Sequence, residues 1–217
     1  MAVRMKIDFV SDVSCPWCVI GLQSLQAALD QLSDEIEPEL HFQPFELNPQ
    51  MGPGGQDIVE HIERKYGSTA AQIEQSQEMI RSRGAELGFQ FDMDKRRRIY
   101  NTFDAHRLLH WADLEGHQPE LKRALFRAYF TDGLDPSDHE VLVGVVTRVG
   151  LDPARARQIL ASDEFAKEVR DRERLYTSHG IQAVPSVIIN DRHLIQGGQP
   201  VAVFEQALRQ IATQPST

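Results

Sequence analysis

The stretch MKIDFVSDVSCPWC, residues 5–18, decides the fold of this chain. Apolar and polar residues alternate over residues 5–10, which is the pattern of a strand with one buried face. The mainly polar residues 11–14 then predict a turn, in which the carboxylate of Asp12 takes an Asx-type role. A cysteine, Cys15, follows this turn directly, so the sequence places a reactive side chain at the end of a strand.

The two cysteines of the chain, Cys15 and Cys18, are three residues apart. Random placement would produce that spacing in roughly 1% of cases, so the spacing carries information. A structural disulfide is disfavoured, because a bridge across two residues closes too short a loop to stabilise a fold. A structural zinc ion needs about four ligands, and the chain has no second cysteine pair. The spacing therefore favours a redox-active dithiol.

A helix is predicted directly after the turn, because four leucines recur at helical spacing over residues 22–32. Pro16 suits the first helical position, where no backbone N–H is needed. Cys15 then lies at the helix N-terminus, where the helix dipole and unpaired N–H groups favour a thiolate. We expect Cys15 to be the attacking thiol and Cys18 the resolving thiol. Trp17 offers an apolar platform beside the sulfur or simply covers the surface.

Strand patterns return near the C-terminus. Residues 186–189 and 193–196 predict two strands, and residues 190–191 between them predict the turn of a hairpin. A final helix is predicted from Pro200, because apolar residues recur on one face over residues 201–211. The chain therefore opens with a strand and a helix and closes with a hairpin and a helix.

These segments carry a resemblance to a known family. The run Cys-Pro-Trp-Cys at 15–18, together with Ala-Val-Pro-Ser at 183–186, resembles the thioredoxin superfamily and, more narrowly, the FrnE-like branch of the DsbA family. Further segments typical of that branch are residues 45–49, 101–102, 105–108, 125–130 and 197–200. The resemblance covers nearly the whole chain.

The resemblance implies an α/β chain, a thioredoxin fold with a large all-helical insertion. Its predicted bounds are 1–52 for the first half of the thioredoxin fold, 53–160 for the helical insertion domain and 161–217 for the second half. It also implies that the Val184–Pro185 bond is cis, lies against the dithiol, and offers the Val184 backbone to an extended substrate. Without the family, Pro185 merely begins an edge strand.

Substrate positioning then falls to Pro16, Trp17, Val184 and Pro185. The exported DsbA proteins usually carry histidine where this chain has Trp17, and that histidine helps to lower the pKa of the attacking thiol. We therefore expect a less oxidising dithiol here than in the exported proteins. If its reduction potential lies about 60 mV above the cytosolic poise, roughly 99% of the enzyme rests in the reduced form.

The middle of the chain, residues 57–180, predicts successive helices. We expect these helices to form a wall over the dithiol, with Asn101, Thr102, Phe103 and His106 as candidate groove residues. Other roles stay open, because Asn101 and Thr102 suit a helix cap and Phe103 suits a helical core.

Three further features of this region favour structural roles. Ser137 followed by Glu140 predicts a capping box. The basic run at 95–98 is expected to be a solvated helix face paired with nearby acidic residues. His106 and His110 have the spacing of metal ligands on a helix, but no third ligand is evident, so no metal site is expected.

The composition narrows the class of partner. The 217 residues carry a net charge of −9 with a pI near 5.4, which disfavours binding to nucleic acid or to anionic membranes. No stretch approaches the roughly 20 apolar residues of a membrane span. Residues 1–10 lack the apolar core of a signal peptide, so we expect a cytoplasmic protein with no membrane partner.

The leading hypothesis is a cytoplasmic thiol–disulfide oxidoreductase that acts on protein or low-molecular-weight disulfides. It needs no bound cofactor, and glutathione is a candidate co-substrate. The resemblance also extends to glutathione-dependent enzymes of the 2-hydroxychromene-2-carboxylate isomerase and kappa-class transferase kind, which typically carry serine at the position of Cys15. A redox-sensitive chaperone is the third hypothesis, and a homodimer is compatible with all three.

Overall fold

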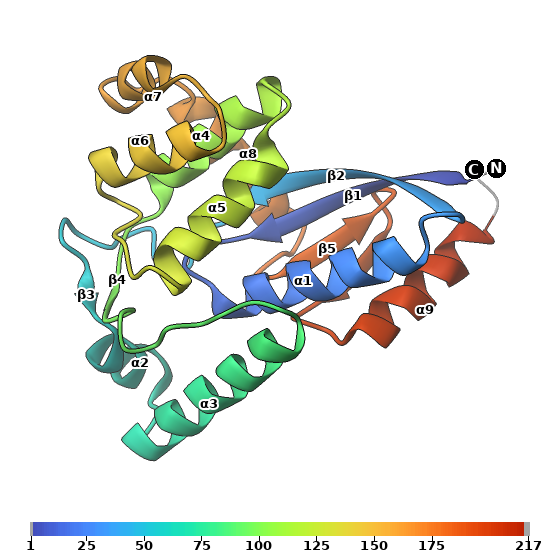
Figure 1. Ribbon diagram of the computed structural model, residues 1–217, viewed down its shortest axis with the longest axis horizontal. Helices are drawn as coiled ribbons and strands as arrows, with labels where there is room; N and C mark the ends of the chain where they lie inside the picture. Colours follow the sequence, from blue (N-terminus) through green and yellow to red (C-terminus); the bar gives the residue numbers. More distant parts are fainter. Residues whose placement is uncertain (1, 215–217) are drawn as a thin grey trace.

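The computed structural model describes residues 2–214, so Met1 and residues 215–217, at the ends of the predicted first and last segments, lie outside the described residues. The helices and strands follow one another along the chain as shown in Figure 1. They are β1 (Val3–Ser11), α1 (Pro16–Gln31), β2 (Ile36–Pro44), β3 (Gln56–Asp57), α2 (Ile58–Tyr66), α3 (Ala70–Glu86), β4 (Arg98–Ile99), α4 (Phe103–Leu114), α5 (Gln118–Phe130), α6 (His139–Arg148), α7 (Pro153–Leu160), α8 (Ala166–Ser178), β5 (Ser186–Ile189), β6 (His193–Gln196) and α9 (Val201–Ala212).

The central sheet has the strand order β2-β1-β5-β6 (Figure 1). β1 runs parallel to β2, with Val3 opposite Ile36, and antiparallel to β5, with Phe9 opposite Val187. The β5–β6 hairpin turns at residues 190–191, both with left-handed φ, as a tight hairpin turn requires. The predicted first strand and the predicted hairpin are confirmed.

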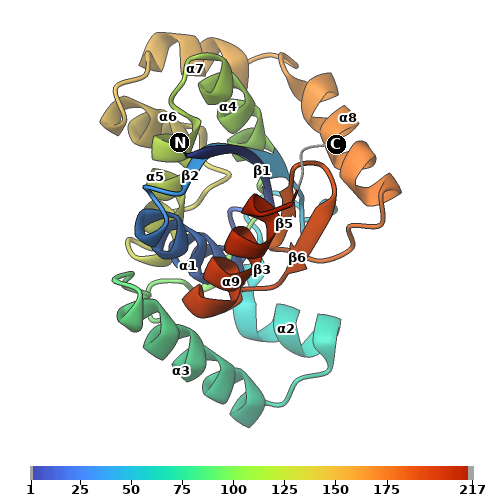
Figure 2. The ribbon, with the colours of Figure 1, turned by 90° about the vertical axis from the view of Figure 1, so that its right-hand side faces the viewer.

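Helices α1 and α9 pack together on one face of the sheet, where Met5, Ile7 and Phe9 are fully buried. Helices α4, α5 and α8 pack toward β2, and α8 lies on the far side of the sheet from α1 (Figure 2). This layered arrangement of helices around a mixed sheet confirms the predicted α/β thioredoxin fold.

The inserted helices form two groups on opposite sides of the molecule (Figure 2). Helices α2 and α3 lie on one side with the β3–β4 ladder, and α4–α7 lie on the other around their own buried cluster. One edge of α5 nevertheless belongs to the sheet's core, because Phe126, Tyr129 and Phe130 share a cluster with Phe9. The domain bounds given above remain a prediction.

The start of α6 differs from the predicted capping box. The N-cap residue is Asp138, whose carboxylate accepts hydrogen bonds from the backbone N–H groups of Glu140 (2.8 Å) and Val141 (3.1 Å). Ser137 instead donates its hydroxyl to Asp135 at 2.6 Å. The prediction was wrong by one residue, because two adjacent residues can both cap a helix and the loop geometry selects Asp138.

Residues 95–98 do not form the predicted solvated helix face. They lie in the segment that joins α3 to α4, and Arg96 is buried there. Its guanidinium lies 4.8 Å from the ring centre of Phe130 and 5.1 Å from that of Tyr129, and it donates to the Ser14 carbonyl at 3.2 Å. The prediction is wrong for the helix and for Arg96, because aromatic rings from α5 provide a cation–π site. Lys95, Arg97 and Arg98 are exposed, and Lys95 pairs with Asp92 at 2.9 Å as predicted.

Candidate active site

The cysteine pair lies at the start of α1, where Cys15 is the N-cap residue and Pro16 occupies the first turn. The backbone N–H of Cys18 donates to the Cys15 carbonyl at 3.1 Å, which closes one turn and brings the two side chains together. Cys15 is 4% exposed and Cys18 is 0% exposed, and both are free thiols. The predicted placement of Pro16 at the helix start is confirmed.

The two thiols differ in acidity. A hydrogen bond from the Cys18 side chain lowers the pKa of Cys15, helped by the backbone N–H groups of Cys18 and Trp17 and opposed by burial and by Asp12. Burial raises the pKa of Cys18 well above its ordinary value, and the nearby Cys15 raises it further. Cys15 is therefore the thiol that ionises first, and the thiolate is the nucleophile.

The loop that ends at β5 meets the cysteine pair. The Val184–Pro185 bond is cis, and the Sγ of Cys15 donates to the Val184 carbonyl at 3.7 Å across 169 residues of sequence. A Cβ at Gly21 would lie 2.9 Å from the Cγ of Pro185, so glycine is what lets α1 approach this loop. The structure thus brings Cys15, Val184 and Pro185 together.

Trp17 is held from both sides. The guanidinium of Arg83, on α3, lies 5.5 Å from the Trp17 ring centre and donates to the Gly198 carbonyl at 2.8 Å. A Cβ at Gly198 would lie 3.0 Å from the Trp17 carbonyl oxygen. Arg83 therefore ties the dithiol turn to the loop before α9, a role that no local pattern in the sequence indicates.

Asp12 organises the turn before the dithiol. Its carboxylate accepts the Ser14 N–H at 3.2 Å, which confirms the predicted Asx-type turn, and it accepts the Leu47 N–H at 2.7 Å. The Nε2 of His106 lies 3.6 Å away. Burial opposes ionisation of Asp12, but His106 and the hydrogen bonds outweigh it and hold the pKa of that carboxyl below its ordinary value.

The other candidate groove residues gather at the start of α4. The Asn101 side chain accepts the Phe103 N–H at 2.9 Å and donates to Glu46 at 3.4 Å. Thr102 is buried, and the Arg170 guanidinium lies 3.8 Å from the Phe103 ring centre. These residues therefore contact the loop that leaves β2 and helix α8. Their role in substrate binding stays a prediction.

Lys122, on α5, was missed by the sequence-based prediction. It is 1% exposed, burial lowers its pKa to about 8, and its charge favours the thiolate form of Cys18. One pattern could have found it: Lys122, Phe126 and Tyr129 fall on one helix face, so this lysine stands in an otherwise apolar row.

Two features are absent from residues 2–214. They contain no group of three or more histidine, cysteine, aspartate or glutamate side chains that could hold a metal ion. Nor do they contain a helix with the length and apolar character needed to cross a membrane.

Known proteins share this arrangement. The family model described as DSBA-like thioredoxin domain matches residues 6–209. The crystal structure of probable DsbA oxidoreductase SCO1869 from Streptomyces coelicolor has a TM-score of 0.90 and 30% sequence identity, covering 98% of this chain and 92% of that chain.

Two further solved structures share the fold at lower identity. One is 2-hydroxychromene-2-carboxylate isomerase, with a TM-score of 0.68 and 13% identity over 95% of each chain. The other is cytosolic disulfide reductase DsbM from Pseudomonas aeruginosa with GSH, with a TM-score of 0.65 and 16% identity over 96% of this chain and 100% of that chain.

The matched region contains both the dithiol and the loop that meets it, so the likeness extends to the reactive part of the molecule. The chain therefore belongs to the DSBA-like thioredoxin domain family, and it is a thiol–disulfide oxidoreductase.

Proposed function

We propose that this enzyme reduces or exchanges disulfides of proteins and of low-molecular-weight thiols, with Cys15 as nucleophile and Cys18 as resolving thiol. The observation that carries the proposal is the pair of free thiols at the start of α1, with the Cys15 sulfur 3.7 Å from the Val184 carbonyl. The surroundings of the two sulfurs support it, because they lower the pKa of Cys15 and raise that of Cys18. A dithiol needs this difference, because only one sulfur should attack the substrate while the other stays protonated.

In the first step, the Cys15 thiolate attacks one sulfur of a substrate disulfide. A Cys15–substrate disulfide forms, the substrate S–S bond breaks, and one substrate sulfur leaves as a thiolate that takes up a proton. The carbonyl of Val184, 3.7 Å from the Cys15 sulfur, lies where an extended substrate segment can pair with the backbone. Pro185 holds this carbonyl against α1.

In the second step, Cys18 loses its proton and attacks the Cys15 sulfur. The Cys15–Cys18 disulfide forms, and the second substrate sulfur leaves as a thiol, so two electrons have passed from the enzyme to the substrate. The charge of Lys122 favours the Cys18 thiolate in this step. Two molecules of glutathione then return the enzyme to the dithiol and become glutathione disulfide.

The proposal includes a place in the cell and a branch of the family. DsbM, which shares the fold, is by name a cytosolic disulfide reductase and was solved with GSH. With Trp17 between the cysteines, we assign this chain to the FrnE-like branch and to the cytoplasm, where glutathione is available. A reduction potential well below the glutathione poise would contradict this proposal, because glutathione could not then return the enzyme to the dithiol.

The test is reduction of insulin by dithiothreitol, with Cys15→Ser and Cys18→Ser as paired variants. Cys15→Ser should lose all catalysis, whereas Cys18→Ser should accumulate a mixed disulfide that mass spectrometry detects. Equal activity in the wild type and in Cys15→Ser would sink the proposal. Prevention of insulin aggregation without any turnover would instead favour the chaperone hypothesis.

A glutathione-dependent isomerase is the second candidate, because 2-hydroxychromene-2-carboxylate isomerase shares the fold. Turnover of a chromene carboxylate with glutathione separates the two functions. The isomerase should tolerate Cys18→Ser, since it needs no resolving thiol. The oxidoreductase should leave the chromene unchanged.

A further inference from the structure

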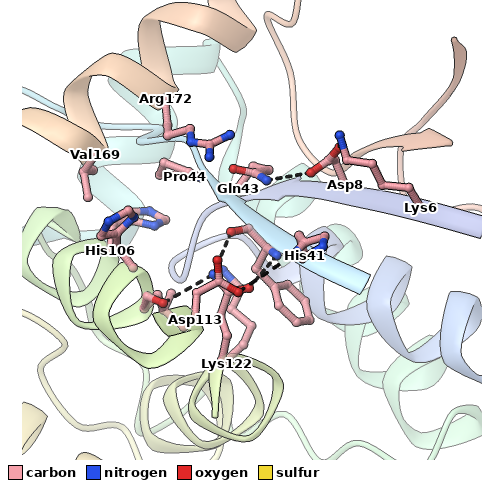
Figure 3. A pocket seen from close by; sticks show the side chains of 14 residues that line it. Lys6, Asp8, His41, Gln43, Pro44, His106, Asp113, Lys122, Val169 and Arg172 are labelled. Atoms are coloured by element: carbon pink, nitrogen blue, oxygen red, sulfur yellow. Dashed lines mark hydrogen bonds and ion pairs between the residues drawn. The ribbon is translucent and has the colours of Figure 1, made fainter. Parts of the chain in front are cut away.

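A cavity of about 200 Å³ lies between the sheet and helices α4, α5 and α8. Figure 3 shows Lys6 and Asp8 of β1 on one side, His106 of α4 opposite, and Arg172 reaching in from α8. Roughly six or seven water molecules occupy this volume in liquid water. The cavity therefore has room for a small polar ligand with water around it. Neither cysteine lines this cavity.

Three basic side chains of the cavity have no hydrogen-bond acceptor among residues 2–214. Lys122 is 1% exposed, and its ammonium lies 4.9 Å from the ring centre of Phe126. The Nε2 of His106, 3% exposed, makes no hydrogen bond to the described residues, and its ion-pair partner Asp12 lies 3.6 Å away. Arg172 lines the cavity and has no hydrogen-bond or ion-pair partner in the part of the chain that the structure describes.

The acidic groups of the cavity are already paired. Asp8 accepts the side-chain N–H of Gln43 at 2.6 Å and lies 3.2 Å from the ammonium of Lys6. Asp113 is partly exposed and faces His41 at 3.7 Å. Within the described chain, Lys122 and His106 are therefore buried basic side chains without a hydrogen-bond acceptor, which is costly, whereas Arg172 is exposed at the rim.

We propose that this cavity binds a small oxyanion, a carboxylate or phosphate group, on the side chains of Lys122, His106 and Arg172. The ligand supplies the acceptors that the chain itself does not provide. Arg172 offers a planar fork at the rim, a geometry that matches both kinds of oxyanion, and Lys122 offers a point charge at the buried end. The site is separate from substrate disulfides, which meet Cys15 beside Val184.

The test measures the thermal unfolding midpoint and the heat of binding with inorganic phosphate and with acetate at constant ionic strength. The wild type should show a saturable rise in the midpoint, because a ligand that binds only the folded state stabilises it. Lys122→Met should abolish the saturable rise. Arg172→Gln should weaken binding by about tenfold or more, and Arg148→Gln, an exposed arginine on α6, should bind as the wild type does.

Each result decides the proposal. A lower half-saturation concentration for phosphate assigns the site to phosphate groups, and the reverse assigns it to carboxylates. An equal, non-saturating rise in all four proteins indicates salt exclusion from the surface and overturns the proposal. Absence of binding to the wild type overturns it as well. Because Arg172 is exposed, its variant tests the site even if Lys122→Met folds poorly.

Discussion

The reactivity of this protein depends on how one sulfur is surrounded. Cys15 gains hydrogen bonds from the Cys18 side chain and from backbone N–H groups, and these outweigh both its burial and the negative charge of Asp12, so its pKa falls. Cys18 is fully buried, and burial raises its pKa by more than the charge of Lys122 lowers it. The same two side chains would be equivalent in an unfolded chain, so the difference comes from local geometry at the start of α1.

Alkylation measures this difference directly. The rate of reaction of Cys15 with iodoacetamide should rise with pH around a midpoint below the ordinary cysteine pKa, because the thiolate forms at lower pH in the folded protein. Cys18 should stay unreacted over the same range. Mass spectrometry of the alkylated peptide checks both statements, and urea-unfolded protein is the control. Equal rates in folded and unfolded protein at pH 7 would contradict the lowered pKa of Cys15.

The second prediction at the residue scale concerns Lys122 and the dependence of protein stability on pH. The pKa of Lys122 is about 8 in the folded protein against an ordinary value of 10.5, so between these values the unfolded chain binds more protons and stability rises with pH. Below pH 8 both states are protonated and the burial cost is complete. Lys122→Met should therefore stabilise the oxidised protein at pH 7 by about 1–3 kcal/mol, and the gain should shrink above pH 8.

Urea unfolding at several pH values measures the gain in stability of Lys122→Met. The disulfide form is used because it has no free thiols that titrate over the same pH range. Arg123→Met is the matched control, because Arg123 is the exposed neighbour on the same helix, and it should change stability by less than about 0.5 kcal/mol. A destabilised Lys122→Met at pH 7 would show that the lysine makes a favourable interaction in the oxidised state.

At the scale of elements, the starts of α6 and α7 show which of two neighbouring polar side chains caps a helix. Asp152 caps α7 as its sequence with Pro153 indicates, through a 2.8 Å hydrogen bond from the Ala154 N–H. At α6, by contrast, Asp138 takes the cap and Ser137 stabilises the preceding loop. Loop geometry therefore decides between neighbouring capping residues.

The cap of α6 can be tested by substitution. Asp138→Ala should lower the free energy of unfolding by about 1 kcal/mol, because two N–H groups lose their acceptor. Ser137→Ala should cost less, since its hydroxyl bonds only within the loop. Denaturant unfolding followed by circular dichroism gives both values. A larger loss of stability in Ser137→Ala than in Asp138→Ala would instead support the predicted capping box, with Ser137 as the N-cap residue.

At the scale of the whole molecule, the inserted helices and the thioredoxin fold are joined through buried groups. Arg96 links the dithiol turn to α5 through Ser14 and two aromatic rings. The side chain of Gln118, at the start of α5, accepts the Phe42 N–H at 2.8 Å and donates to the Phe42 carbonyl at 3.0 Å. These contacts cross the predicted domain bounds.

We therefore expect one cooperative unfolding transition. The two tryptophans report separately, because Trp17 lies at the dithiol and Trp111 lies in the α4–α7 cluster. Fluorescence of the single-tryptophan variants Trp17→Phe and Trp111→Phe in urea should give coincident midpoints that also match circular dichroism. Two separated transitions would instead support an insertion that folds by itself.

Local sequence was sufficient for much of the framework. The alternation in β1, the leucine spacing of α1, the β5–β6 hairpin and the face of α9 all follow from the periodicity of side chains along one element. The spacing of Cys15 and Cys18 likewise indicated a dithiol before any fold was known. In each case the interacting residues are neighbours in the chain, so the pattern is visible in one short window.

Only the tertiary structure decided the surroundings of that dithiol. Arg83 on Trp17, Arg96 beneath Ser14, and Lys122 near Cys18 are each brought from more than sixty residues away. Their charges are placed there because aromatic rings and backbone carbonyls from distant elements converge on them, which no local pattern encodes. The sequence by itself determined which atoms react, whereas long-range packing decided how acidic they are and what lies behind them.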